Sequence, residues 1–286
     1  MKLKRNIIIL VLLFNCINGF GQTKVMSLNI RYDNPNDGVN WWENRKEEVV
    51  QLIDFYHPEF LGIQEGLSNQ LEFIVDKLNG YNYIGVGRDD GKQQGEFAAI
   101  IFDSTKFKLI ETKTFWLSQT PDTVSVGWDA SMERISTYGA FINKNTKDSI
   151  FIFNCHFDHI GKISRKMSSE LILKKINEFG LNESRLIVMG DLNCESQDEP
   201  IQVLRQELDD AVEISEKPHY GPHGTFSGFD NNLIIKKRID YILTKNLRIK
   251  NYRHVDDRRK NNLYISDHLP VLVEIIETTG NNAYTQ

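Results

Sequence analysis

The stretch "RLIVMGDLN", residues 185–193, decides the fold class. Residues 186–189 form a short apolar run that is partly β-branched, which predicts a buried β-strand. The run breaks at Gly190 and then presents Asp191 and Asn193, two positions apart. Side chains with this spacing face the same side of a strand. The stretch therefore predicts a core strand whose end directs a carboxylate and a carboxamide to one place.

Other strand-like runs surround this one along the chain. They are KVMSLNI, EFLGIQE, YNYIGVG, EFAAIIF, ERISTYGAFI, SIFIFNCHF, KKRIDYIL and LPVLVEII. Residues 81–157 are nearly all of this kind, which predicts antiparallel hairpins. The mixture of many strands with a few helices predicts an α/β (α+β) fold in which two mixed β-sheets pack together and are flanked by helices.

Helical periodicity appears in two segments. Residues 43–56 repeat apolar side chains at helical spacing, with Val49 and Ile53 on the predicted inner face. Residues 164–179 do the same, and their predicted inner face includes Met167, Leu171, Ile172, Ile176 and the stem of Lys174.

The first 21 residues are expected to be a signal peptide. A basic start is followed by the apolar run at residues 7–14, which is too short to span a bilayer as a helix. Two alternatives stay open: a retained anchor, and a lipoprotein attached through Cys16. We therefore expect an exported protein with one catalytic domain at residues 22–277 and a flexible tail at 278–286.

Charge and cysteine content exclude some classes of protein. The formal charge of −5 becomes −8 when Lys2, Lys4 and Arg5 are removed. An acidic chain argues against non-specific binding of duplex DNA through counterion release. Cys155 and Cys194 remain after cleavage, and their spacing matches no zinc module. Whether they form a disulfide is open from the sequence.

Polar side chains recur at the ends of the predicted strands. Burial of such groups without partners costs about a few kcal/mol each, so we expect them to be satisfied together. Carboxylate and amide oxygens suit a hard divalent cation such as Mg²⁺ or Mn²⁺. A Ser–His–Asp hydrolase is set aside because the chain has no G-x-S-x-G motif. The residues concerned are Asn29, Glu65, His156, Asp191, Asn193, Asp240, Asp267 and His268.

In this order, these residues resemble the endonuclease/exonuclease/phosphatase superfamily, also called DNase-I-like. The most specific motifs are "GDLN", "RIDYI" and "SDHLPV", and the resemblance covers nearly all of residues 24–276. Further stretches, including "NIRYDNPNDG" and "HFDHIGKISR", resemble a bacterial subgroup that is often exported. The resemblance implies a four-layer sandwich with the active site at the strand ends between the two sheets.

The resemblance also implies a role for each residue. Glu65 would bind Mg²⁺ or Mn²⁺ directly, with Asn29 and Asp267 close by. Asp191 would deprotonate the attacking water, and Asn193 would hold that water or a phosphate oxygen.

The two histidines carry further implied roles. His268 would donate to a phosphate oxygen while Asp240 fixes its tautomer. His156 is the second catalytic histidine of the family, with Glu96 as its carboxylate partner.

Four further residues have less specific expected roles, near the bound phosphate or elsewhere on the substrate. Arg134 matches a family arginine near the phosphate. Asp158, His159 and Arg88 are expected to contact substrate or, equally, to form local turns.

The predicted function is a divalent-metal-dependent phosphoesterase that hydrolyses a phosphodiester by in-line attack of an Asp-activated water. A phosphomonoesterase acting on a sugar phosphate, an inositol phosphate or a phospholipid headgroup is the alternative. An inactive surface binding protein with the same fold is the alternative of another class. Nucleic acids and nucleotides also remain as substrates, because "NLIIKKRID" offers a basic loop near the site. We expect a monomer without a stable protein partner.

Overall fold

The computed structural model describes residues 22–277 as two six-stranded mixed sheets packed face to face. The first sheet has the spatial order β11 (Arg248–His254), β12 (Val271–Ile276), β1 (Gln22–Asn29), β2 (Phe60–Gly66), β4 (Phe97–Asp103) and β3 (Tyr81–Ile84). The second has the order β5 (Phe107–Trp116), β6 (Ile135–Asn143), β7 (Ser149–His156), β8 (Leu186–Asp191), β10 (Asp240–Lys245) and β9 (Asp209–Asp210). Only the β1–β2 and β7–β8 pairs are parallel.

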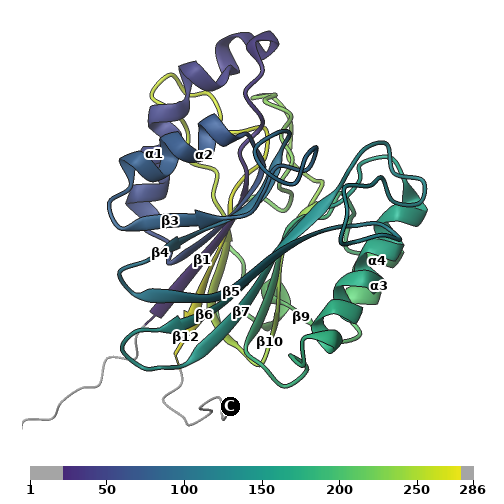
Figure 1. Ribbon diagram of the computed structural model, residues 1–286. Coiled ribbons are helices and arrows are strands. Elements are labelled where there is room, and N and C mark those ends of the chain that lie inside the picture. The colour runs from purple at the N-terminus through teal and green to yellow at the C-terminus, as the bar shows by residue number, and fades with distance from the viewer. Residues whose placement is uncertain (1–21, 278–286) are drawn as a thin grey trace, which may run out of the picture.

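Helices cover the outer face of each sheet (Figure 1). The helices α1 (Lys46–Tyr56) and α2 (Ser68–Lys77) pack on the first sheet, and α3 (Lys162–Glu178) and α4 (Glu199–Leu204) pack on the second. The remaining helices are short: η1 (Pro35–Asn40), η2 (Trp42–Asn44) and α5 (Ala211–Ile214). These layers confirm the predicted four-layer sandwich.

Alternation along the strands divides the core into three layers. In β8, Leu186 and Val188 face the α3 side, whereas Ile187 and Met189 face the other sheet. Since both faces are covered, the strand reads as a continuous apolar run rather than as an alternating one. The polar residues at the strand ends, described below, lie at one edge of the inter-sheet layer.

Every predicted strand run contains a strand, but three strands within residues 22–277 have no predicted run of their own. These are β5, β9 and β11. Much of β5 is solvent-exposed on an edge of its sheet, so it lacks the apolar run that marks a core strand. The predicted hairpins are present as β3–β4 and as β5–β6–β7, but β4 and β5 lie in different sheets.

The inner face predicted for α3 was partly wrong. Lys174 is exposed, and the buried face instead includes Ser164, Ser168 and Ser169 together with Ile172 and Ile176. The small serine side chains allow the helix backbone to approach its neighbours closely, and Lys175 is also buried, so burial here does not follow hydrophobicity. A periodicity based on apolar residues cannot detect such a face.

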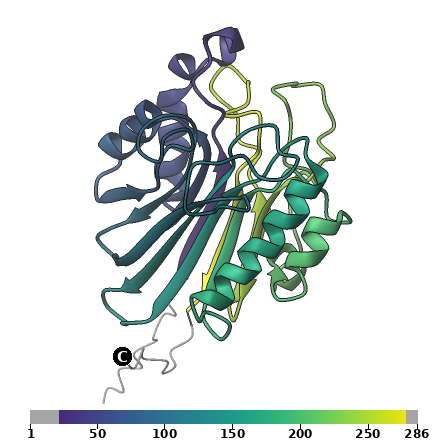
Figure 2. The ribbon, with the colours of Figure 1, turned by 45° about the vertical axis from the view of Figure 1, so that its right-hand side comes forward.

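The two ends of the described chain meet at the edge of the sandwich opposite the site. Thr23 donates to a carboxylate oxygen of Glu277, and both ends lie at the bottom of the view in Figure 2. None of the helices within residues 22–277 is long and apolar enough to cross a membrane. The predicted signal peptide, Cys16 and the predicted tail lie outside the described residues, and the domain boundaries stay predictions.

Candidate active site

The polar strand ends meet at one edge of the sandwich, between the two sheets. On the second sheet, His156, Asp191 and Asp240 are neighbours across β7, β8 and β10, because His156 pairs with Asp191 and Asp191 pairs with Asp240. On each strand, the polar side chain lies on the same face as the apolar side chains that are buried between the sheets. On the first sheet, Asn29 ends β1 on the equivalent inner face. Strand alternation alone therefore directs four polar side chains into the inter-sheet layer.

Glu65 reaches the same place by a different route. Ile63 faces the outer core, so simple alternation would also turn Glu65 outward. The β2–β4 pairing shifts register between Ile63 and Gly66, and Glu65 has a left-handed backbone with φ of 61°. A bulge of this kind re-aims a side chain. It brings Glu65 within hydrogen-bond distance of Asn29, whose Nδ2 donates to Glu65 Oε1 at 3.0 Å and to Asp191 Oδ2 at 3.1 Å.

These side chains open into a cleft of about 480 Å³. It is lined by Arg31, Tyr32, Glu65, Glu96, Met132, Arg134, His156, His159, Asp191, Asn193, Phe226, Lys237, Ile239, Asp267 and His268. Nine of the predicted site residues are in this lining. Asn29 and Asp240 lie directly behind it as buried partners of residues that do line it.

Asp191 and Asn193 both line the cleft, but only Asp191 does so as part of a strand. The strand β8 ends at Asp191, and Asn193 has a left-handed backbone with φ of 49°. The backbone N–H of Asn193 donates to Asp191 Oδ1 at 3.0 Å, and its side-chain Nδ2 donates to the Phe157 carbonyl at 3.0 Å. Strand alternation therefore places Asp191, whereas a tight turn places Asn193 at the cleft beside it.

Asp240 and His268 form a buried hydrogen-bonded pair. His268 Nδ1 lies 2.9 Å from Asp240 Oδ2, which confirms that Asp240 has the partner its apolar surroundings require. Burial opposes charge on the imidazole, but the carboxylates of Asp240 and Asp191 outweigh it and hold the pKa of His268 well above its usual value. His268 Nε2 lies 3.8 Å from Asp191 Oδ2 and so faces the cleft.

The acidic groups of the cleft fit a divalent cation. Burial, reinforced by the charge of Asp240, raises the pKa of Asp191 to about 7. Burial likewise raises the pKa of Asp267, with Glu65 adding to the shift. Oδ1 of Asp240 is buried and has no hydrogen-bond partner within residues 22–277. Crowded carboxylates of this kind, which a bound cation would stabilise, are the ligands that hard divalent ions prefer.

Two sets of residues are suitable as ligands. Asp191, Asp240 and His268 offer atoms that all lie within 4.8 Å of one another. However, the His268–Asp240 hydrogen bond already engages two members of that set. In the predicted set, Glu65 and Asp267 line the cleft, whereas Asn29 lies behind it and its Oδ1 accepts from the backbone N–H of Arg31 at 3.0 Å. Glu65 and Asp267 are therefore the members of this set that a cation in the cleft could reach.

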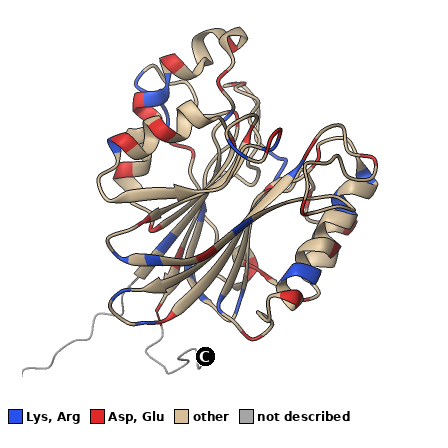
Figure 3. Cartoon of the chain, viewed as in Figure 1, with Lys and Arg blue, Asp and Glu red and all other residues tan. Residues whose placement is uncertain are grey.

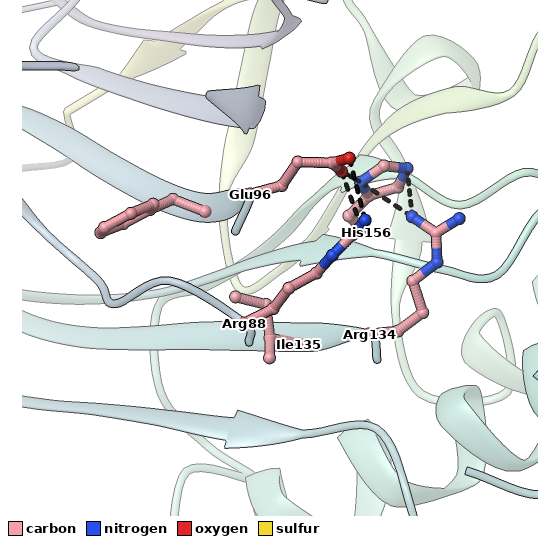
Figure 4. A pocket seen from close by; sticks show the side chains of 6 residues that line it. Arg88, Glu96, Arg134, Ile135 and His156 are labelled. Atoms are coloured by element: carbon pink, nitrogen blue, oxygen red, sulfur yellow. Dashed lines mark hydrogen bonds and ion pairs between the residues drawn. The ribbon is translucent and has the colours of Figure 1, made fainter. Parts of the chain in front are cut away.

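Two arginines, Arg88 and Arg134, gather around Glu96 and His156, and these side chains line a smaller pocket next to the cleft (Figure 4). The Arg134 side chain is 4% exposed and its NH1 lies 3.0 Å from His156 Nε2. Burial, followed by the charges of Arg134 and Arg88, lowers the pKa of His156 well below its usual value. His156 is therefore neutral at physiological pH, unlike His268.

Glu96 is paired mainly with Arg88, not with His156 as the sequence suggested. Arg88 NH1 and NH2 donate to the two carboxylate oxygens of Glu96 at 2.7 and 2.9 Å, whereas His156 Nδ1 lies 3.7 Å from Glu96 Oε2. The bidentate geometry matches the planar guanidinium to the carboxylate. Arg88 therefore positions Glu96 beside His156 and is absent from the lining of the cleft.

Asp158 holds a turn together and does not face the cleft. It is fully buried and accepts hydrogen bonds from Ser131 N–H and Oγ–H and from the backbone N–H of Ile160 and Gly161. Burial opposes its ionisation, but these hydrogen bonds outweigh burial and lower its pKa. Of the two readings of Asp158, the structure favours the local turn, while its neighbour His159 lines the cleft.

Sequence reasoning missed several cleft residues. Arg31 and Tyr32 follow Asn29 within the motif "NIRYDN", and Lys237 lies in the basic stretch that was expected near the site. Met132, Phe226 and Ile239 carry no chemical signal, since apolar residues in loops are not distinctive in a sequence.

The two cysteines near the site pack as small apolar side chains. Both are free and buried in the core between the second sheet and its helices. Burial raises the pKa of each thiol to about 12. Neither is therefore a reactive thiolate at neutral pH.

This fold and this cluster of acids, imidazoles and guanidinium groups define a phosphoester hydrolase. The chain belongs to the Endonuclease/Exonuclease/phosphatase family, whose sequence profile matches residues 26–268. Members of this family are generally dependent on divalent metal ions.

Three relatives illustrate the similarity. A family protein from Bacteroides thetaiotaomicron is 36% identical, covers 89% of this chain and 97% of its own, and superposes with a TM-score of 0.85. The mannosyl-6-phosphatase of B. thetaiotaomicron VPI-5482 is 35% identical over 89% of this chain and 100% of its own, also with a TM-score of 0.85. The uncharacterized protein L388 of Acanthamoeba polyphaga mimivirus is 30% identical over 183 residues, which is 61% of this chain and 68% of that protein. The chain spans only 33% of the length of two more distant curated relatives.

Proposed function

We propose that the protein hydrolyses small phosphate monoesters, with a sugar phosphate as substrate, in the presence of a divalent cation. The observation that carries this proposal is the cleft. Its volume of about 480 Å³ is typical of small-molecule sites, which span about 300–1,000 Å³. In the ribbon of Figure 3, lysines and arginines are interspersed with acidic residues along the chain.

The resemblance to the mannosyl-6-phosphatase supports the same substrate class. It covers the whole of that chain at 35% identity, so the two share the sandwich. The proposal therefore adopts the sugar phosphate alternative in place of the phosphodiester that the sequence favoured. The prediction of an inactive binding protein has no support, since the catalytic groups meet in one cleft.

In the proposed mechanism, Asn193 orients the attacking water and Asp191 takes its proton as the new P–O bond forms. The bond between phosphorus and the sugar oxygen breaks, and the sugar leaves as an alcohol after taking a proton from solvent. A pKa of about 7 suits Asp191 to a base that works near neutral pH. The His268 imidazolium donates from Nε2 to a phosphate oxygen, and Asp240 holds the ring from the other side. Arg134 adds a second positive charge opposite the acids. A divalent cation held by Glu65, with Asn29 and Asp267 beside it, would neutralise a phosphate oxygen.

Export from the cytoplasm remains part of the proposal. It rests on the basic start and apolar run of the first 21 residues. Mass spectrometry of the protein purified from its native host should find an N-terminus near residue 22. An intact first residue would contradict cleavage.

The test is a comparison of two esters. Purified protein with Mg²⁺ should release inorganic phosphate from mannose 6-phosphate faster than it hydrolyses bis-p-nitrophenyl phosphate, and EDTA should abolish both reactions. Faster hydrolysis of the diester would instead support the phosphodiesterase that the sequence predicted.

Two substitutions test the mechanism. Asp191→Asn and His268→Gln should each lower kcat by at least about a hundredfold, because general acid–base groups contribute about that much or more. The matched control is Asp122→Asn, an exposed carboxylate that pairs with Lys113 and is not in the lining of the cleft. The melting temperature should stay within a few degrees of the parent's, and near-normal turnover by Asp191→Asn would remove its assigned role.

A further inference from the structure

His159 lines the cleft without a part in the mechanism above. We propose that His159 binds a hydroxyl group of the sugar and so makes the enzyme prefer polyhydroxylated leaving groups. This inference rests on the proposed function, since it names the residue that recognises the alcohol part of the monoester.

The position of His159 separates it from the other two histidines of the cleft. His156 and His268 are 6% and 4% exposed and face Asp191, where the phosphorus would lie. His159 is exposed and still belongs to the lining of the cleft. It therefore lies at the outer part of the cleft, where the alcohol portion of a bound ester would extend.

The turn that carries His159 is held rigidly. Asp158, the preceding residue, is fully buried and bonds to the N–H groups of Ile160 and Gly161 on the far side of His159. The same carboxylate holds Ser131 from the neighbouring loop. A binding side chain on a fixed backbone loses little conformational entropy when its ligand arrives.

The tautomer of His159 is set by Arg134. Arg134 NH2 lies 2.9 Å from His159 Nδ1. A guanidinium group can only donate, so Nδ1 must accept and the ring proton lies on Nε2. No residue within 22–277 accepts a hydrogen bond from Nε2. His159 thus presents one oriented, unused N–H donor at the cleft.

The surrounding side chains suit a sugar rather than a plain alkyl group. Lys237 supplies further N–H donors to the same cleft, and Phe226 and Met132 supply apolar surface. Sugar rings combine hydroxyl groups that accept hydrogen bonds with apolar C–H faces. A donor such as His159 therefore discriminates between alcohols that have a hydroxyl group at the right place and alcohols that lack one.

The experiment compares mannose 6-phosphate with cyclohexylmethyl phosphate, which has the same ring size and primary ester but no hydroxyl groups. Phosphate release with Mg²⁺ is measured for the parent, His159→Asn and His159→Gln. Asn keeps an acceptor near the Nδ1 position for Arg134 but does not reach the Nε2 position, whereas the Gln amide does. With His159→Asn, kcat/KM for mannose 6-phosphate should fall by about fivefold, the value of one neutral hydrogen bond, chiefly through KM.

The same variant should leave kcat/KM for cyclohexylmethyl phosphate unchanged, and His159→Gln should recover most of the sugar activity. The control His57→Gln changes an exposed histidine at the end of α1 and should alter neither substrate. An equal loss on both esters would overturn the proposal and assign His159 to phosphate binding or to the fold. If the parent releases no phosphate from either ester, the proposed function fails first and this inference fails with it.

Discussion

Gly190 shows how one residue decides whether the site can form. Its φ is 141°, and a Cβ atom at this position would lie 1.9 Å from the carbonyl oxygen of Cys155 on the neighbouring strand. Glycine therefore allows β7 and β8 to approach closely next to His156 and Asp191. The glycine that interrupts the apolar run in "LIVMGDLN" is required by this contact.

We predict that Gly190→Ala lowers the free energy of unfolding by about 3 kcal/mol or more, because the clash adds to backbone strain. Urea denaturation measures the change. Gly38→Ala is the matched control, since Gly38 also has a positive φ of 58° but would place its Cβ in open space. Equal losses for the two variants would show that strain alone, and not the contact with Cys155, accounts for the glycine.

His254 gives a residue-level prediction for pH. It is 1% exposed, its Nδ1 lies 2.7 Å from the Pro222 carbonyl, and Tyr252 Oη lies 2.8 Å from its Nε2. Burial lowers its pKa to about 3, despite the hydrogen bond with Pro222, which acts in the opposite direction. Below pH 6.5 the unfolded chain therefore takes up a proton at this residue that the folded chain does not.

This difference destabilises the folded protein as the pH falls from about 6.5 towards 3, by about 1.4 kcal/mol per pH unit. His254→Gln should remove that contribution, so the stability advantage of the parent over the variant should shrink between pH 6 and pH 4.5. Denaturant titrations of both proteins at these pH values measure it. A constant difference between the two would mean that His254 titrates alike in both states.

At the scale of elements, the two sheets are joined by a polar contact just below the site. Asn154 of β7 is fully buried, and its Nδ2 donates to the carbonyls of Ile63 at 2.8 Å and Ala99 at 2.7 Å in the opposite sheet. Its Oδ1 accepts from Gln64 Nε2 at 2.6 Å. Gly62 leaves the space for this side chain. The contact fixes β2 next to the bulge that turns Glu65 inward.

We predict that Asn154→Ala lowers the free energy of unfolding by about 3 kcal/mol, because it leaves buried polar groups unpaired. Catalytic activity should fall as well, since Glu65 loses its support. Thermal melting and phosphate release would measure the two effects. The control Asn145→Ala removes an exposed amide from a loop and should have no effect on either. Unchanged activity in a destabilised Asn154 variant would separate the sheet contact from the site.

Helix α3 illustrates the limit of pattern reading at this scale. Its existence followed from periodicity, but three of its six buried residues are serines and one is Lys175. The hydrophobic pattern assigns a face by polarity, whereas close packing against the sheet selects small side chains. Only the packed structure shows which criterion prevails.

At the scale of the whole molecule, folding brings carboxylates from both sheets into one cleft. Repulsion between these like charges lowers the free energy of unfolding, and a bound divalent cation should raise it again. We predict that Mg²⁺ at millimolar concentration raises the melting temperature of the parent by about 5 °C, as expected for about 2 kcal/mol of binding energy.

Glu65→Gln should remove most of this rise. Glu111→Gln, on the exposed face of β5, is the control and should keep it. Differential scanning calorimetry with Mg²⁺ and with EDTA gives the comparison. A full rise in the Glu65 variant would move the cation to Asp191, Asp240 and His268, the other set with suitable spacing.

The sequence by itself determined the layered fold and most of the residues of the site. Apolar runs with polar ends are properties of short segments, and alternation along each strand turns Asn29, His156, Asp191 and Asp240 to the same layer once the sheets pack. The sequence motifs that resemble the family then point to these residues in order.

Only the tertiary structure decided the interactions between segments. It turned Glu65 inward through a bulge, paired Glu96 with Arg88, buried Asp158 beneath its turn and set the tautomer of His159 through Arg134. These outcomes depend on contacts between residues far apart in the chain and on backbone angles that no local pattern encodes. Side-chain periodicity predicts which side chains lie on each face of a strand. The packing of the strands and loops against one another determines which of those side chains come into contact.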